Sequence, residues 1–143
     1  MKLSLARPST IDFQKIFMNN PLHFITELLK RPIYEVAWVF YMMAINLGAI
    51  FFWEEAVAKI IVAVFILSSM LMMGLYSKFG FTRILGLGHI LWFPLAFYIG
   101  FELGTTDGIY LIYLIVLLIT ISISLVIDTL DVLKYLRGNT AFE

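Results

Sequence analysis

Long apolar segments alternate with short polar ones along most of the chain. The apolar segments cover about residues 33–53, 56–76, 84–101 and 109–130. Each is about 18 to 22 residues long, which at a helical rise of about 1.5 Å per residue suffices to cross a hydrocarbon layer about 30 Å thick. The pattern therefore predicts an all-α integral membrane protein, with a bundle of four transmembrane helices between residues 33 and 137.

The segments between the apolar stretches are too short to hold a folded domain. They read WEE, SKFGFTR and ELGTTDG, and a short tail follows at residues 138–143. We therefore expect one four-helix domain, preceded by an N-terminal segment at residues 1–32. Any chemistry is expected inside the bundle or at its two ends.

Composition supports a membrane protein and narrows the chemistry. Hydrophobic residues make up 62% of the chain and charged residues 14%, against about half and about a quarter in a soluble domain. Ten basic residues balance ten acidic ones, so the charge indicates no nucleic-acid partner. The chain has no cysteine, which removes disulfides, thiolate catalysis and cysteine-ligated metals. We expect no cofactor and no metal.

Basic residues divide unequally between the two ends of the predicted bundle. Lys59 alone falls at one end, and the other nine fall at the opposite end: Lys2, Arg7, Lys15, Lys30, Arg31, Lys78, Arg83, Lys134 and Arg137. Lysine and arginine accumulate on the cytoplasmic side of membrane proteins. The distribution predicts that both termini are cytoplasmic, as in a multi-pass protein of a bacterial inner membrane.

A short amphipathic helix is predicted at about residues 21–31, before the first apolar segment. Asn20 is a suitable N-cap and Pro21 a suitable first helical residue, while Pro32 disfavours helix at the residue before it. Apolar and polar residues then fall on opposite sides, as in a helix that lies in the membrane interface. Glu27 and Arg31 are four residues apart and are expected to pair.

Two carboxylates at the end of the fourth apolar segment need an explanation. Asp128 and Asp131 share one helical face with Thr120, Ser124 and Tyr135. Because an ionised group facing lipid costs several kcal/mol, we expect this face to turn toward neighbouring helices or a wet groove. Asp131 is nearer to water, so it is expected to be the less sensitive of the two to substitution.

Three ionisable residues on other segments are expected near this pair of aspartates. Glu35 begins the first segment, and Arg83 and His89 begin the third. The sequence therefore predicts a cluster of Glu35, Arg83, His89, Asp128 and Asp131 near the cytoplasmic end.

Two interpretations of this cluster remain open. The groups can simply satisfy one another at a helix interface, with His89 joining the third helix to the fourth. Alternatively they form a proton or cation site, since ionisable residues inside membranes often mark ion pathways and histidine changes charge near neutral pH.

Small residues predict how the third helix packs. Gly86, Ala96 and Gly100 share a face that can bring backbones close together, which favours helix association in lipid. Pro94 lacks the amide hydrogen that would bond to the carbonyl of Ile90, so a kink is expected near the middle of this helix.

The motifs of common enzymes are absent. The sequence contains no HExxH, no phosphate-binding loop and no GxSxG elbow. We therefore expect a non-enzymatic membrane protein that acts by association, as a homo-oligomer or as an accessory subunit of a membrane complex. A small proton- or cation-coupled transporter or channel is the alternative, and an enzyme acting on lipid is a third hypothesis.

Overall fold

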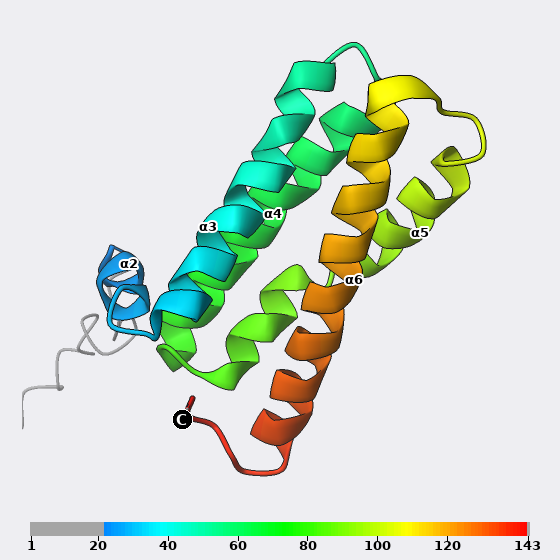
Figure 1. The fold of residues 1–143 in the computed structure, drawn as a ribbon. Helices are drawn as coiled ribbons and strands as arrows, with labels where there is room; N and C mark the ends of the chain where they lie inside the picture. The colour runs from blue at the N-terminus through cyan, green and yellow to red at the C-terminus, as the bar shows by residue number, and fades with distance from the viewer. Residues whose placement is uncertain (1–21, 143) are drawn as a thin grey trace, which may run out of the picture.

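The computed structural model describes residues 22–142, which form a bundle of helices joined by short turns (Figure 1). The start of the predicted amphipathic helix, at Asn20 and Pro21, lies outside the described residues. Apart from one isolated β-bridge, between Thr82 and Ala141, the regular structure of residues 22–142 is helical. The prediction of an all-α fold is confirmed for this part of the chain.

The first half of the bundle is a helical hairpin. Helix α2 covers His23–Leu28, and α3 covers Ile33–Leu47 and continues as a 3₁₀ helix, η1, at Gly48–Phe52. Helix α4 returns alongside them at Ala56–Phe79 (Figure 1). Both the α3–η1 unit and α4 are long and apolar enough to cross a membrane.

The second half holds a broken helix and the longest helix of the described residues. The 3₁₀ helix η2 covers Arg83–His89, α5 covers Trp92–Glu102, and α6 covers Gly108–Leu136. Helix α6 thus extends past residue 130, where the fourth apolar segment ends. Gly138 follows it with a φ of 93°, in the left-handed region that glycine favours after a helix.

The third apolar segment is not one straight helix. Helices η2 and α5 meet at an angle of 41°, and when they are taken as one bent unit they are a fourth segment long and apolar enough to cross a membrane. The break falls between His89 and Trp92, one turn before Pro94. Proline deletes the hydrogen bond to the carbonyl four residues earlier and its ring crowds that carbonyl, which accounts for a break at Ile90. The 3₁₀ conformation of η2 was not predicted.

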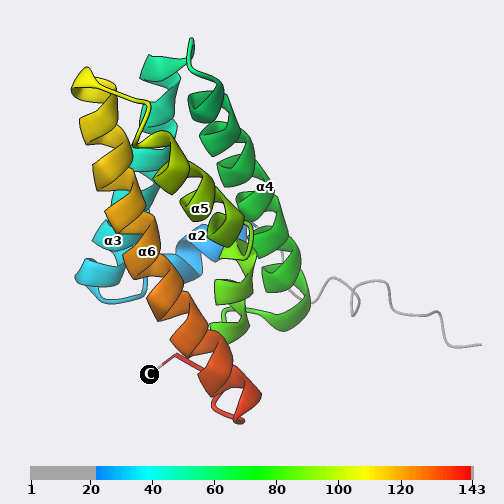
Figure 2. The same ribbon diagram turned by 90° about the vertical axis from the view of Figure 1, so that its right-hand side faces the viewer.

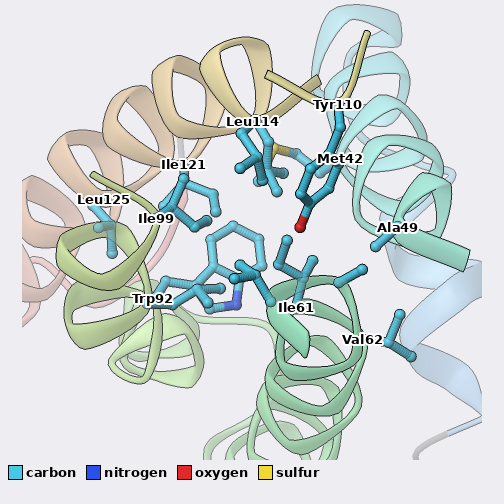
Figure 3. Packing of buried hydrophobic residues seen from close by; sticks show 14 residues of the cluster. Met42, Ala49, Ile61, Val62, Trp92, Ile99, Tyr110, Leu114, Ile121 and Leu125 are labelled. Carbon is cyan, nitrogen blue, oxygen red and sulfur yellow. The ribbon is translucent and has the colours of Figure 1, made fainter. Parts of the chain in front are cut away.

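Apolar side chains from all four segments fill the middle of the bundle. Trp92 points from α5 into this core, toward Ile61 of α4 and Ile121 of α6 (Figure 3). The α3–η1 unit lines the core from Met42 to Ala49, and α6 lines it from Tyr110 to Leu125. Figure 2 shows α5 between α4 and α6. The broken third segment therefore closes one side of the core.

Helix α2 is docked on the bundle by a second, smaller apolar cluster. Phe24 and Leu28 are buried against Tyr76 of α4 and Leu85 of η2. The Tyr76 hydroxyl donates a hydrogen bond to Glu27, at 2.8 Å. One apolar edge of α2 therefore faces protein, while Ile25 stays exposed.

Two glycines let η2 fit between α4 and α6. A Cβ atom added to Gly86 would lie 2.9 Å from the backbone oxygen of Asp128, and one added to Gly88 would lie 3.0 Å from the Cβ of Met72. The first contact is with backbone, which cannot move aside as the end of a side chain can. Gly86 is therefore the point of closest approach between η2 and α6.

The packing face that the sequence predicted for the third segment is confirmed only in part. Ala96 packs against the core, but Gly100 is exposed and a Cβ there would meet no atom within 4 Å. The core face of α5 is instead formed by Trp92, Leu95 and Ile99. Ala96 lies at the edge of this face, and Gly100, a further turn of about 40° around the helix, lies outside it.

Replacing Gly86 by alanine should destabilise the protein, because the new methyl group meets backbone in a closely packed interface. We expect a loss of about 1 to 3 kcal/mol in the free energy of unfolding in detergent. The matched variant Gly100→Ala should be neutral or stabilising by about 0.5 to 1 kcal/mol, since alanine favours helix where there is room. Equal losses at both positions would contradict the proposed approach of η2 to α6.

Candidate functional site

We call the end of the bundle where α3 begins and α6 ends the basic end (Figure 1). Within residues 22–142, three ion pairs are found, and all three lie toward this end: Arg31–Glu35, Arg83–Asp131 and His89–Asp128. Two of them join η2 to α6, and the third lies at the start of α3.

The 3₁₀ conformation of η2 aligns the residues that contact α6. A 3₁₀ helix has three residues per turn, so side chains three positions apart lie one above the other. Arg83, Gly86 and His89 have this spacing. On α6, Asp128 and Asp131 are also three apart and lie on one side of the helix. The two ion pairs therefore flank the contact at Gly86.

His89 and Asp128 form the deeper of these two pairs. The Nδ1 atom of His89 lies 2.9 Å from Oδ2 of Asp128, and Ser124 donates a hydrogen bond of 3.2 Å to the same oxygen. The imidazole also contacts the indole of Trp92, with 4.3 Å between ring centroids. Both members of the pair are 18% exposed, whereas Trp92 is 1% exposed. The pair thus lies at the boundary of the apolar core.

Arg83 is held by both α6 and the C-terminal tail. Its Nη1 atom donates to Asp131, its Nε atom donates to the carbonyl of Ala141 at 3.0 Å, and its backbone amide donates to the carbonyl of Thr140 at 3.0 Å. The side chain of Arg83 is 9% exposed and that of Asp131 is 18% exposed. A charge-assisted hydrogen bond contributes about 1.5 to 3 kcal/mol, and partial exposure reduces this contribution.

Phe142 brings the tail against two arginines. Its ring lies 5.3 Å from the guanidinium carbon of Arg31 and 5.4 Å from that of Arg83, within the range of a cation–π contact. The ring of Phe81 lies 5.4 Å away. The tail therefore connects the start of α3 with the start of η2.

Glu35 does not join the predicted cluster. It binds Arg31 through two hydrogen bonds, of 2.8 and 3.0 Å, one helical turn away. The hydrogen bond to Glu35 raises the pKa of Arg31 above its ordinary value. Since Arg31 binds Glu35 and Glu27 binds Tyr76, the expected Glu27–Arg31 pair does not form. Pairing with Arg31, just before α3, separates Glu35 from the other four residues.

The four residues that do come together can hold a proton and join two helices. In residues 22–142, no group of three or more histidine, cysteine, aspartate or glutamate residues is arranged to hold a metal ion. Each carboxylate has one cationic or titratable partner. The arrangement fits both the structural interpretation and a single protonation site at His89 and Asp128.

Two tyrosines that the sequence analysis did not single out also join α3 to α6. The hydroxyl of Tyr41 lies 2.8 Å from that of Thr120, which itself donates to the carbonyl of Val116. Tyr113 donates to the carbonyl of Ile45 at 2.8 Å. Thr120 belongs to the polar face that the sequence did indicate, but its partner on α3 could not be identified from the helical pattern.

Comparison of the chain with protein-family models, with curated protein sequences and with solved structures found no match.

The geometry reverses the expected sensitivities of the two aspartates. Asp131→Leu should remove the carboxylate from Arg83, which remains charged, at a cost of about 1.5 to 3 kcal/mol in the free energy of unfolding. Asp128→Leu should cost less, because an imidazole, unlike a guanidinium, need not carry a charge.

Thermal or chemical unfolding of the purified protein in detergent would measure both values. As a control, Glu35→Gln leaves η2 and α6 unchanged and should have a smaller effect. A larger loss of unfolding free energy for Asp128→Leu than for Asp131→Leu would show that the Arg83–Asp131 pair contributes less to stability than the His89–Asp128 pair.

Proposed function

We propose that the chain is a four-span protein of the bacterial inner membrane with both termini in the cytoplasm, and that it acts by association with a second copy or with another membrane protein. Three helical segments and the bent η2–α5 pair are long and apolar enough to cross a membrane. Large apolar side chains are exposed on the outer faces of α3 to α6, such as Phe51, Phe97 and Val126. Lipid is the environment in which such surfaces are stable.

The filling of the interior is the observation that supports association over conduction. From Ala49 to Leu125, the centre of the bundle is packed with apolar side chains, and Trp92 lies directly beside His89. The ion pairs of the described residues lie on one side of this apolar core. A bundle packed in this way has its outer surface available for partners, whereas its interior is occupied by its own side chains.

The absence of cysteine from the chain allows one set of single-cysteine variants to test both parts of the proposal. Cysteines in place of Lys30 and Asn139 should react with a membrane-impermeant thiol reagent only from the cytoplasmic side. Cysteines in place of Glu55 and Thr105 should react only from the opposite side. In the same membranes, a cysteine at exposed Phe97 should form a crosslink to a second copy or to a partner.

Gentle detergent extraction followed by mass measurement should then give a mass above that of one chain. A cysteine at Leu67, exposed on α4, serves as a comparison for the face of α5. A single chain by mass, without crosslinks at either position, would overturn the proposed association. Labelling of Thr105 from the cytoplasmic side would overturn the proposed topology.

The His89–Asp128 pair supports a second candidate function, a proton- or cation-coupled transporter or channel. Its members are hydrogen-bonded, partly exposed and next to the apolar core, and the carboxylate also accepts a bond from Ser124. A carboxylate beside a histidine can take up and release a proton, which an amide cannot do.

Asp128→Asn separates the two functions. If the pair carries protons, this variant should lose proton flux in proteoliposomes while keeping its thermal stability, because the amide preserves shape and hydrogen bonding. The control Asp131→Asn should retain flux, since Asp131 binds Arg83 instead of His89. Equal leak rates in wild-type and protein-free liposomes would exclude the transport hypothesis.

A further inference from the structure

A groove on the outer surface of the bundle follows from the break in the third segment. It has a volume of about 350 Å³ and lies between the start of α5 and one face of α6. The residues that line it are Phe93, Ser122, Leu125, Val126, Thr129 and Leu130. The groove lies beside the start of α5, where the third segment bends away from the direction of η2.

The side chains that line this groove have no free hydrogen-bond donor left for an occupant. Its two hydroxyl groups are already used within α6, because Ser122 donates to the carbonyl of Leu118 at 2.8 Å and Thr129 donates to that of Leu125 at 2.7 Å. Phe93 and Val126 present their side chains outward. An occupant therefore gains from apolar contact and needs no hydrogen bond.

The same face of α6 carries an exposed cation at the basic end. Leu133 and Arg137 follow Val126 by seven and eleven residues, so both lie within about 20° of it around the helix axis. Leu133 is exposed and continues the apolar surface. Arg137, at the C-cap of α6, is exposed and forms no ion pair with any residue from 22 to 142.

The spacing between groove and cation fits the dimensions of a phospholipid. Arg137 lies about 10 Å beyond Leu130 along the axis, from seven residues at about 1.5 Å each. The polar layer of one leaflet is about 5 to 8 Å thick, by the difference between the full bilayer and its hydrocarbon core. A phosphate at Arg137 therefore places its acyl chain beside Leu133 and then in the groove.

We propose that this groove and Arg137 form a binding site for one phospholipid, with an acyl chain in the groove and the phosphodiester on the guanidinium. The site rests on the proposed location of the chain in a membrane. Arginine binds phosphate through several parallel hydrogen bonds, and an anion at the C-terminal end of a helix needs such a partner because the helix dipole there is unfavourable.

Native mass spectrometry of the delipidated full chain in detergent tests the site with two probes of equal chain length, phosphatidylglycerol and diacylglycerol. One phosphatidylglycerol should be retained, and Arg137→Gln should weaken its binding about tenfold, equivalent to about 1.4 kcal/mol. The same variant should leave diacylglycerol binding unchanged, since diacylglycerol has no phosphate. Lys78→Gln removes an exposed charge at the same end of the bundle but on another helix, in the last turn of α4, and should change binding less than twofold.

A second pair of variants tests the groove. Val126→Trp should fill it and weaken both probes, whereas Ile127→Trp, one residue away on the neighbouring lipid-facing surface, should weaken neither. Equal losses from Arg137→Gln and Lys78→Gln, equal affinity of the wild-type chain for both probes, or no effect of Val126→Trp would each overturn the site. Lipid retention by a chain that proves to be monomeric would contradict only the proposed association.

Discussion

The contact between η2 and α6 at Gly86 is the constraint on which the rest of the structure depends. Because no side chain separates the two backbones there, Arg83 and His89 reach the aspartates one turn apart on α6. The same approach positions the start of α5, so that Trp92 enters the core. A bulkier residue at Gly86 would move the ion pairs and the apolar core together, and neither could be adjusted independently.

The break at residues 90 and 91 divides the third segment into two parts with different roles. Helix η2 is fixed by polar contacts to α6 and by glycine packing against α4, while α5 is fixed by apolar burial of Trp92, Leu95 and Ile99. Polar contacts and apolar contacts favour different environments. The bend lets one segment meet both requirements, and it leaves the outer groove beside α6 as its geometric result.

Much of the helical architecture could be predicted from the sequence, because a long uninterrupted apolar segment is a strong indication of a helix. The association of Arg83, His89, Asp128 and Asp131 could also be anticipated from depth alone. Glu35 was misplaced because its partner, Arg31, lies only four residues away and reaches it first. Gly100 was misplaced because the core face of α5 is set by its large residues, Trp92, Leu95 and Ile99, and not by the small residues that the sequence pattern emphasised.

The return of the C-terminal tail to Arg83 has a consequence for the order of folding during synthesis. Arg83 obtains its carboxylate from a residue 48 positions later and a carbonyl from one 58 positions later, so neither is present when the third segment first leaves the ribosome. Until then its charge lacks these partners, and water or other polar groups must solvate it. Assembly of η2 is therefore a late event, in which the last residues of the described chain complete an element made well before them.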